Sequence, residues 1–139
     1  MSDQRVGPAQ QIRNLVASFR AEAARQPVAP ESLVDASKPK DWTVLAYLEG
    51  RDRLSNSVDV ALNGMEEIGS TDSVNLVAQA TLVPELGDRR FQRMGEVNTR
   101  RYYLTQDSDL AQVQSPVVQQ FEHQEKLNGR SLEDFLCWG

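Results

Sequence analysis

Cysteine is almost absent from this sequence, which removes two common ways of stabilising a small protein. Cys137 is the only cysteine among the 139 residues. A single thiol excludes an internal disulfide and a cysteine-rich metal site. It favours a reducing, cytoplasmic setting, and the opening residues MSDQRVGPAQQ lack the apolar core of a signal peptide. No phosphate-cradling glycine motif is present either, and we expect no cofactor.

Excess positive charge and long apolar runs are also missing. The net charge is −5, and apolar residues make up 40% of the chain. The acidic balance argues against nucleic-acid binding, which needs a basic surface. No apolar run approaches the roughly 20 residues that a membrane-spanning helix needs. The composition is that of an ordinary globular domain, and we expect neither a nucleic-acid nor a membrane partner.

The first 41 residues differ in pattern from the rest. Apolar side chains recur at helical spacing over residues 10–25, at Ile12, Leu15, Val16, Phe19 and Ala23. Residues 26–41 lack an apolar period and contain three prolines, which indicates a linker. We therefore expect an N-terminal helix and a proline-containing linker over residues 1–41, and an α/β domain over residues 42–139. The helix either packs on that domain or binds a partner.

Residues 42–82 predict a strand, a helix and a second strand. Trp42 begins the apolar run WTVLAYL, which is typical of a strand covered on both faces. Apolar residues then follow helical spacing up to Gly69, where a left-handed residue is expected to end the helix. Every second residue from Val74 to Leu82 is apolar, as in a strand. This βαβ pattern predicts an α/β fold built on a parallel sheet.

The last third of the chain gives weaker signals. The segments RFQRMGEV and TRRYYLT flank Asn98 and are expected to pair as an antiparallel β-hairpin. Residues 106–114 are polar and predict a loop, whereas residues 115–127 are ambiguous and fit a strand tip followed by a loop. Ser131 with Asp134 three residues later resembles a capping box, so we expect a helix to begin at Ser131.

Cys137 and His123 are the only thiol and imidazole in the chain. Cys137 falls in the apolar segment FLCW of the predicted helix, where a buried and inert cysteine is expected. His123 falls in the polar segment FEHQEK, so we expect no working dyad. Asp107 and Asp109 do not complete a metal site with them and are interpreted as part of a solvated loop.

Two pairs of neighbouring residues that contain arginine are weaker candidates for a functional site. Arg100 and Arg101 are interpreted as outward-facing strand charges, with a self-processing cleavage site as the alternative. Asp52 and Arg53 follow the carboxyl end of the first predicted strand, where open α/β sheets bind ligands. They are candidate cleft-edge residues, although an aspartate at the start of a helix also complements the helix dipole.

Several pieces of the sequence, taken in order, resemble the amino-terminal part of the clostripain-like cysteine peptidases. The pieces are WTVLAYLEGRDRL, MEEIGSTDSVNLVAQ, TRRYYLT, SPVV and SLEDFLCWG. The pairing of EIGSTDSVNLV with the later RRYYLT is the most specific part. The resemblance covers residues 40–139 and leaves the amino-terminal segment unmatched.

This resemblance implies a caspase-like fold, a mostly parallel sheet with helices on both faces, and cleavage after arginine or lysine by a Cys–His dyad. In the family, the histidine follows the next core strand in a His-Gly context, and the cysteine follows the strand beyond it in an Asp-x-Cys context. Both positions come after the helix that SLEDFLCWG begins, so we expect no catalytic residue in this chain. Residues 50–53 read Gly-Arg-Asp-Arg where the family shows Gly-Asp-Asn, and residues 127–130 read Leu-Asn-Gly-Arg where it shows Met-Gly-Asp-Pro. These departures affect the rim of the expected cleft and not the expected fold.

Three functional hypotheses remain open. In the first, the chain is the amino-terminal segment of such a peptidase, inactive alone, and an unpaired sheet edge beside residues 42–48 binds the missing catalytic part or another copy. A peptide substrate binds only once the domain is completed. In the second, the chain is a non-catalytic binding or scaffold protein with the same fold. In the third, it is a small hydrolase that uses Cys137.

Overall fold

The computed structural model describes most of the region that the sequence predicts to be compact. The described residues are Gly7, Gln10, Arg13 and residues 25–51, 54–83, 97–122 and 129–139. The helix predicted over residues 10–25 lies almost wholly outside them. In the linker region, a short 3-10 turn, η1, spans Pro30–Ser32.

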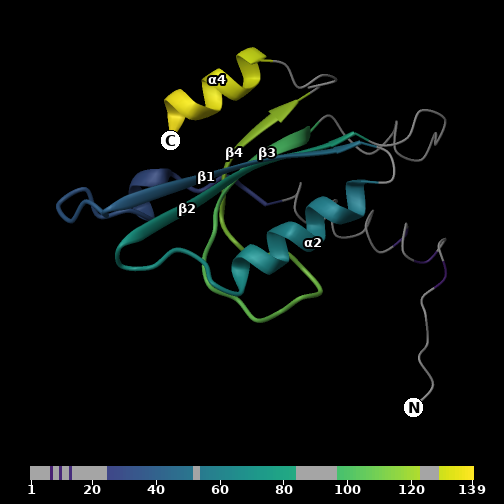
Figure 1. Ribbon diagram of the computed structural model, residues 1–139, viewed down its shortest axis with the longest axis horizontal. Coiled ribbons are helices and arrows are strands. Elements are labelled where there is room, and N and C mark those ends of the chain that lie inside the picture. Colours follow the sequence, from purple (N-terminus) through teal and green to yellow (C-terminus); the bar gives the residue numbers. More distant parts are fainter. Residues whose placement is uncertain are drawn as a thin grey trace.

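The four described strands form one mixed sheet (Figure 1). They are β1 (Trp42–Arg51), β2 (Val74–Val83), β3 (Val97–Tyr103) and β4 (Val117–Glu122), and they lie in the order β1-β2-β3-β4. β1 and β2 are parallel, whereas β3 is antiparallel to both β2 and β4. The α/β fold is confirmed, but the described sheet is mixed where a mostly parallel sheet was predicted.

The βαβ unit has the predicted order. Helix α2 (Ser55–Glu66) connects β1 to β2, and Trp42 pairs with Val74 at the start of the two strands. Gly69 follows the helix with a φ of +64°, the left-handed conformation that glycine adopts without strain. A side chain at Gly69 would also meet the backbone of Thr105 and Gln106. Both the positive φ and the close approach of the neighbouring backbone therefore require glycine at position 69.

The predicted hairpin around Asn98 is replaced by a different pairing. β3 pairs with β4, so that Arg101 lies opposite Gln119 and Arg100 opposite Gln120. Residues 115–127, for which the sequence indicated a strand tip followed by a loop, therefore contain a six-residue strand. The first arm of the predicted hairpin, RFQRMGEV, lies outside the described residues apart from its last residue.

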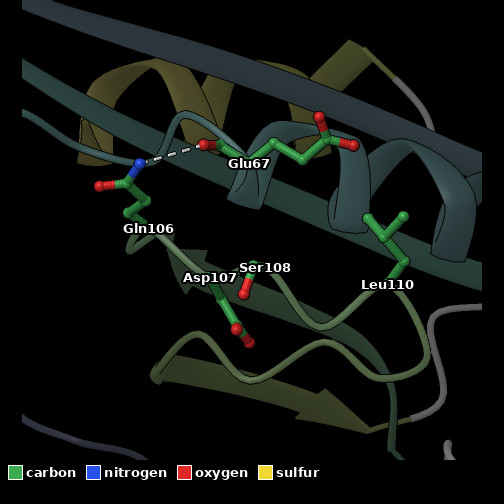
Figure 2. A pocket seen from close by; sticks show the side chains of 5 residues that line it. All are labelled: Glu67, Gln106, Asp107, Ser108 and Leu110. Carbon is green, nitrogen blue, oxygen red and sulfur yellow. Dashed lines mark hydrogen bonds between the residues drawn. The ribbon is translucent and has the colours of Figure 1, made fainter.

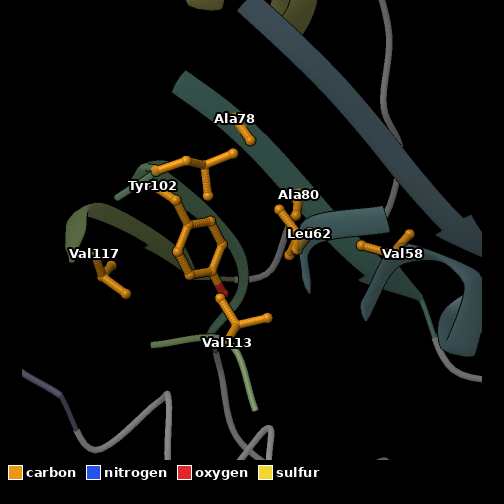
Figure 3. Close-up of a cluster of buried hydrophobic side chains, with 8 residues drawn as sticks. Val58, Leu62, Ala78, Ala80, Tyr102, Val113 and Val117 are labelled. Carbon is orange, nitrogen blue, oxygen red and sulfur yellow. The ribbon is translucent and has the colours of Figure 1, made fainter. Parts of the chain in front are cut away.

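Helices cover both faces of the sheet, with α2 on one face and α4 (Gly129–Trp138) on the other (Figure 1). The main core lies beneath α2, where Leu62 and Tyr102 are almost completely buried (Figure 3). Leu104 belongs to the same core and is fully buried. Burying a leucine or valine side chain contributes about 1.5–3 kcal/mol, so this face supplies much of the driving force for folding. The remaining buried members of this core are Val58, Ala78, Ala80, Val113 and Val117.

Helix α4 begins two residues earlier than the capping-box pattern predicted. Its first residue is Gly129, and Ser131 lies inside the first turn. The Ser131 hydroxyl accepts hydrogen bonds from the Tyr47 hydroxyl at 3.0 Å and from the Gln79 amide at 3.3 Å. Ser131 therefore attaches the helix to the sheet, which is a contact that local sequence does not reveal.

Candidate functional site

The described residues include the chain's only thiol, Cys137, but not its only imidazole, His123. Asp52, Arg53 and His123 lie outside the described residues. Cys137 is exposed, so the prediction of a buried cysteine is wrong. Phe135, two positions earlier, is the residue of α4 that is fully buried against the sheet. Residues two apart on a helix point in very different directions, and burial of Phe135 turns Cys137 away from the sheet.

The interpretation of Arg100 and Arg101 as outward-facing charges is also wrong. Both side chains are buried, with exposed fractions of 2% and 5%. The Arg101 guanidinium donates to the Oε1 atoms of Gln79 and Gln119, each at 2.8 Å. The Arg100 Nε donates to Gln120 Oε1 at 3.4 Å. Glutamine oxygens on the two neighbouring strands thus supply acceptors that make burial of the charges tolerable.

Aromatic rings complete the surroundings of Arg101. Its guanidinium carbon lies 4.9 Å from the ring centre of Phe121, 5.4 Å from that of Phe135 and 4.8 Å from that of Trp138. Burial lowers the pKa of Arg101, and the carboxylate of Asp134 opposes that shift. Because α4 covers this guanidinium, the cluster stabilises the docking of α4 on the sheet and is closed to a substrate.

A second buried group, Glu66, holds the loop between β3 and β4. Its Oε1 atom accepts hydrogen bonds from the backbone N–H groups of Gln114 at 3.0 Å and Ser115 at 2.7 Å, and from the Ser115 hydroxyl. The Ser115 hydroxyl oxygen also accepts from the backbone N–H of Thr105 at 3.1 Å, which ties the two ends of the loop together. The backbone oxygen of Glu66 accepts from the N–H of Asp107 at 2.7 Å. Glu66 therefore has a structural role.

A pocket of about 700 Å³ opens beside this loop (Figure 2). Its lining includes Glu67 from the end of α2 and, from the loop, Gln106, Asp107, Ser108 and Leu110. The carboxyl groups shape the loop itself: Asp107 Oδ1 accepts from the Asp109 N–H at 3.0 Å, and Asp109 Oδ1 accepts from the Ala111 N–H at 2.8 Å. These are turn contacts typical of aspartate.

The pocket lies away from the edge of the sheet where α/β folds usually bind ligands. β3 ends at Tyr103, which pairs with Val77 near the start of β2. The loop thus lies at the amino ends of β1 and β2, opposite the edge where α/β sheets usually bind ligands. The described parts of the chain contain no group of three or more histidine, cysteine, aspartate or glutamate residues able to hold a metal ion.

The open edge of β1 is the strongest candidate for a functional surface. Among the described residues β1 pairs only with β2, and it lies at one end of the sheet. Trp42 and Val44 keep 70% and 47% of their surface exposed. The apolar run over residues 42–48 at the edge of the described sheet is unusual, because unpaired N–H and C=O groups next to apolar side chains invite pairing with another strand. Gly50, near the end of β1, is buried.

No family model, curated protein or solved structure matches this chain. In the described residues, no helix combines the length and the apolar character needed to cross a membrane.

Proposed function

We propose that this chain is the amino-terminal segment of a clostripain-like cysteine endopeptidase and that it hydrolyses no peptide alone. Support comes from the order of the matching sequence pieces and from a parallel β1-α2-β2 unit with helices on both faces of its sheet. The open edge of β1 carries most weight, because the family arrangement places the next strand, the one that leads to the catalytic histidine, along that edge.

The chemistry of such a peptidase needs a thiolate and an imidazole at hydrogen-bond distance in a cleft. Cys137 is exposed on α4, on a helix that resembles the family segment preceding both catalytic residues. In the proposed function, the chain supplies sheet and core, and the segment that completes the sheet supplies the dyad. The completed domain would cut after arginine or lysine in a cytoplasmic setting.

The second candidate function is a non-catalytic binding or scaffold protein with the same fold. Its support is the closed packing of the described domain, in which α2 and α4 each bury their own face of the sheet. A protein of this kind would use the edge of β1 to bind a partner and would have no peptidase activity with any other segment.

The coding sequence after residue 139 separates the two candidates. For the peptidase segment we expect a strand followed by His-Gly, and then a further strand followed by Asp-x-Cys. A stop codon at that position, or a continuation without either motif, would contradict the peptidase proposal and favour the scaffold protein.

A further inference from the structure

We propose that the solvent face of α2, together with the groove beside it, binds a cationic amphipathic helix of a partner protein. Val60, Gly64, Glu67 and Ile68 form this face, and the loop after β3 forms the opposite wall of the groove. α2 lies on the face of the sheet that α4 does not cover (Figure 1). The inference is independent of the proposed function, because it uses no residue of β1.

Three large apolar side chains on this surface are in contact with water. Val60, Ile68 and Leu110 each keep most of their surface exposed. Val60, Gly64 and Glu67 recur at the spacing that places residues on one side of a helix, and Ile68 extends the same stripe. Glu67 and Leu110 line the same pocket, so the loop continues the patch beside the helix (Figure 2). Exposed apolar side chains that gather in one place mark interaction sites, whereas scattered ones do not.

Gly64 is a residue that the fold itself does not explain. Glycine weakens the interior of a helix relative to alanine, and the backbone at Gly64 is helical. A Cβ atom at Gly64 would meet no atom within 4 Å, so internal packing does not require glycine either. Between the exposed side chains of Val60 and Ile68, the missing side chain leaves a notch in which a second helix can approach closely.

Acidic side chains border the groove on both walls. Glu67 lies at the end of α2, and Asp107 lines the pocket from the loop, with Asp109 two residues further along. The hydrogen bonds that Asp107 and Asp109 accept come from neutral amide groups, which do not balance the two negative charges. The sequence has no lysine or arginine between residues 54 and 72 or between residues 104 and 122. A surface of this kind attracts lysine and arginine side chains.

The combination of an apolar stripe and an acidic rim narrows the class of partner. Nucleic acids and anionic membrane surfaces are negative, and the rim would repel both. A second copy of the chain would bring one acidic surface against another, because a two-fold contact pairs a patch with itself. A helix with apolar side chains at positions i, i+4 and i+7, flanked by lysine or arginine, matches both the stripe and the rim.

Binding of a designed peptide tests this surface. The probe is a helical peptide of roughly 14 residues, about as long as α2, with leucine on one face and lysine on the other. One control peptide has glutamate in place of lysine, and the other has serine in place of leucine. We expect the first peptide to bind with a Kd on the order of 10 μM, at least about tenfold more tightly than either control. It should shift the amide resonances of residues 57–68 and 106–110 in NMR spectra.

Two matched pairs of variants test the charge and the apolar contact. Glu67→Lys should weaken binding about tenfold, whereas Glu133→Lys makes the same change of charge at an exposed position of α4 and should alter the Kd by less than about twofold. Leu110→Ser and Leu136→Ser form the second pair, because both leucines are exposed and only Leu110 borders the groove. A cooperative thermal transition in each variant controls for folding.

Gly64→Gln separates binding from stability. Glutamine favours the helix, so we expect the melting temperature to rise by about 3 °C. The new side chain fills the notch, and we expect it to weaken peptide binding about tenfold. A variant that is more stable but binds less is what a glycine kept for a partner predicts.

Absence of binding at peptide concentrations near 1 mM would overturn the inference. So would equal binding of the glutamate peptide, an equal effect of Glu133→Lys, or a Gly64→Gln variant that binds as tightly as the original chain. A chain that forms a dimer which Gly64→Gln dissociates would also overturn it, because a second copy would then occupy the face. The coding sequence after residue 139 decides the proposed function separately, so failure of one leaves the other standing.

Discussion

Replacing Glu66 by alanine is expected to lower the free energy of unfolding by about 4 kcal/mol. The change removes the one oxygen that accepts from two backbone N–H groups and from the Ser115 hydroxyl. A buried donor without an acceptor costs about 1–3 kcal/mol, and the lost side chain also leaves a cavity in the core. Urea denaturation at a fixed protein concentration measures the loss.

Glu66→Gln is the matched control. Glutamine keeps the accepting oxygen and the volume of the side chain, and we expect it to cost about 1–2 kcal/mol. Limited proteolysis should cut residues 104–116 much faster in the alanine variant than in the glutamine variant, because the loop loses its attachment to α2. Equal stability of the two variants would show that hydrogen bonding to Glu66 does not hold this loop.

Replacing Arg101 by alanine is expected to cost about 3 kcal/mol and to loosen α4 from the sheet. The substitution leaves the side-chain oxygens of buried Gln79 and half-buried Gln119 without their donor and removes the group that contacts the rings of Phe135 and Trp138. The fluorescence of Trp138 reports on the helix when Trp42, the other tryptophan, is replaced by phenylalanine. We expect its emission to shift to the red as the ring becomes more exposed.

Arg130→Ala tests whether any arginine in this region has the same effect. Arg130 lies on α4 as well, but its side chain is exposed. We expect a change of less than about 0.5 kcal/mol, as for most surface substitutions. If Arg101→Ala proved equally mild, with unchanged Trp138 emission, the guanidinium could not be what holds α4 in place.

The βαβ unit was predictable because its signals are local. The apolar run from Trp42 is ten residues of strand in the structure, the helical spacing ends near Gly69 as expected, and the alternation from Val74 is a strand. Each of these patterns depends on neighbours within one element, where the helix and strand periods differ clearly. The presence of a C-terminal helix was predictable for the same reason, although its first residue was not.

The buried charges were not predictable, because their partners are distant in sequence. A glutamate is rarely buried, yet Glu66 is, and its hydrogen-bond partners lie 48 and 49 residues further along the chain. Arg101 reads as an exposed strand charge, and its acceptors come from β2 and from β4, whose pairing with β3 no local pattern indicates. The same lack of tertiary information led to the wrong placement of Cys137.

Our central proposal is that this chain contributes a sheet edge and a core to a peptidase but carries out no hydrolysis of its own. The most direct test is the rate at which the purified 139-residue chain hydrolyses an arginyl peptide, with and without an alkylating agent. We predict no hydrolysis above the rate without protein, and no difference between the chain and its Cys137→Ser variant. Hydrolysis that alkylation abolishes and that Cys137→Ser lacks would contradict the claim.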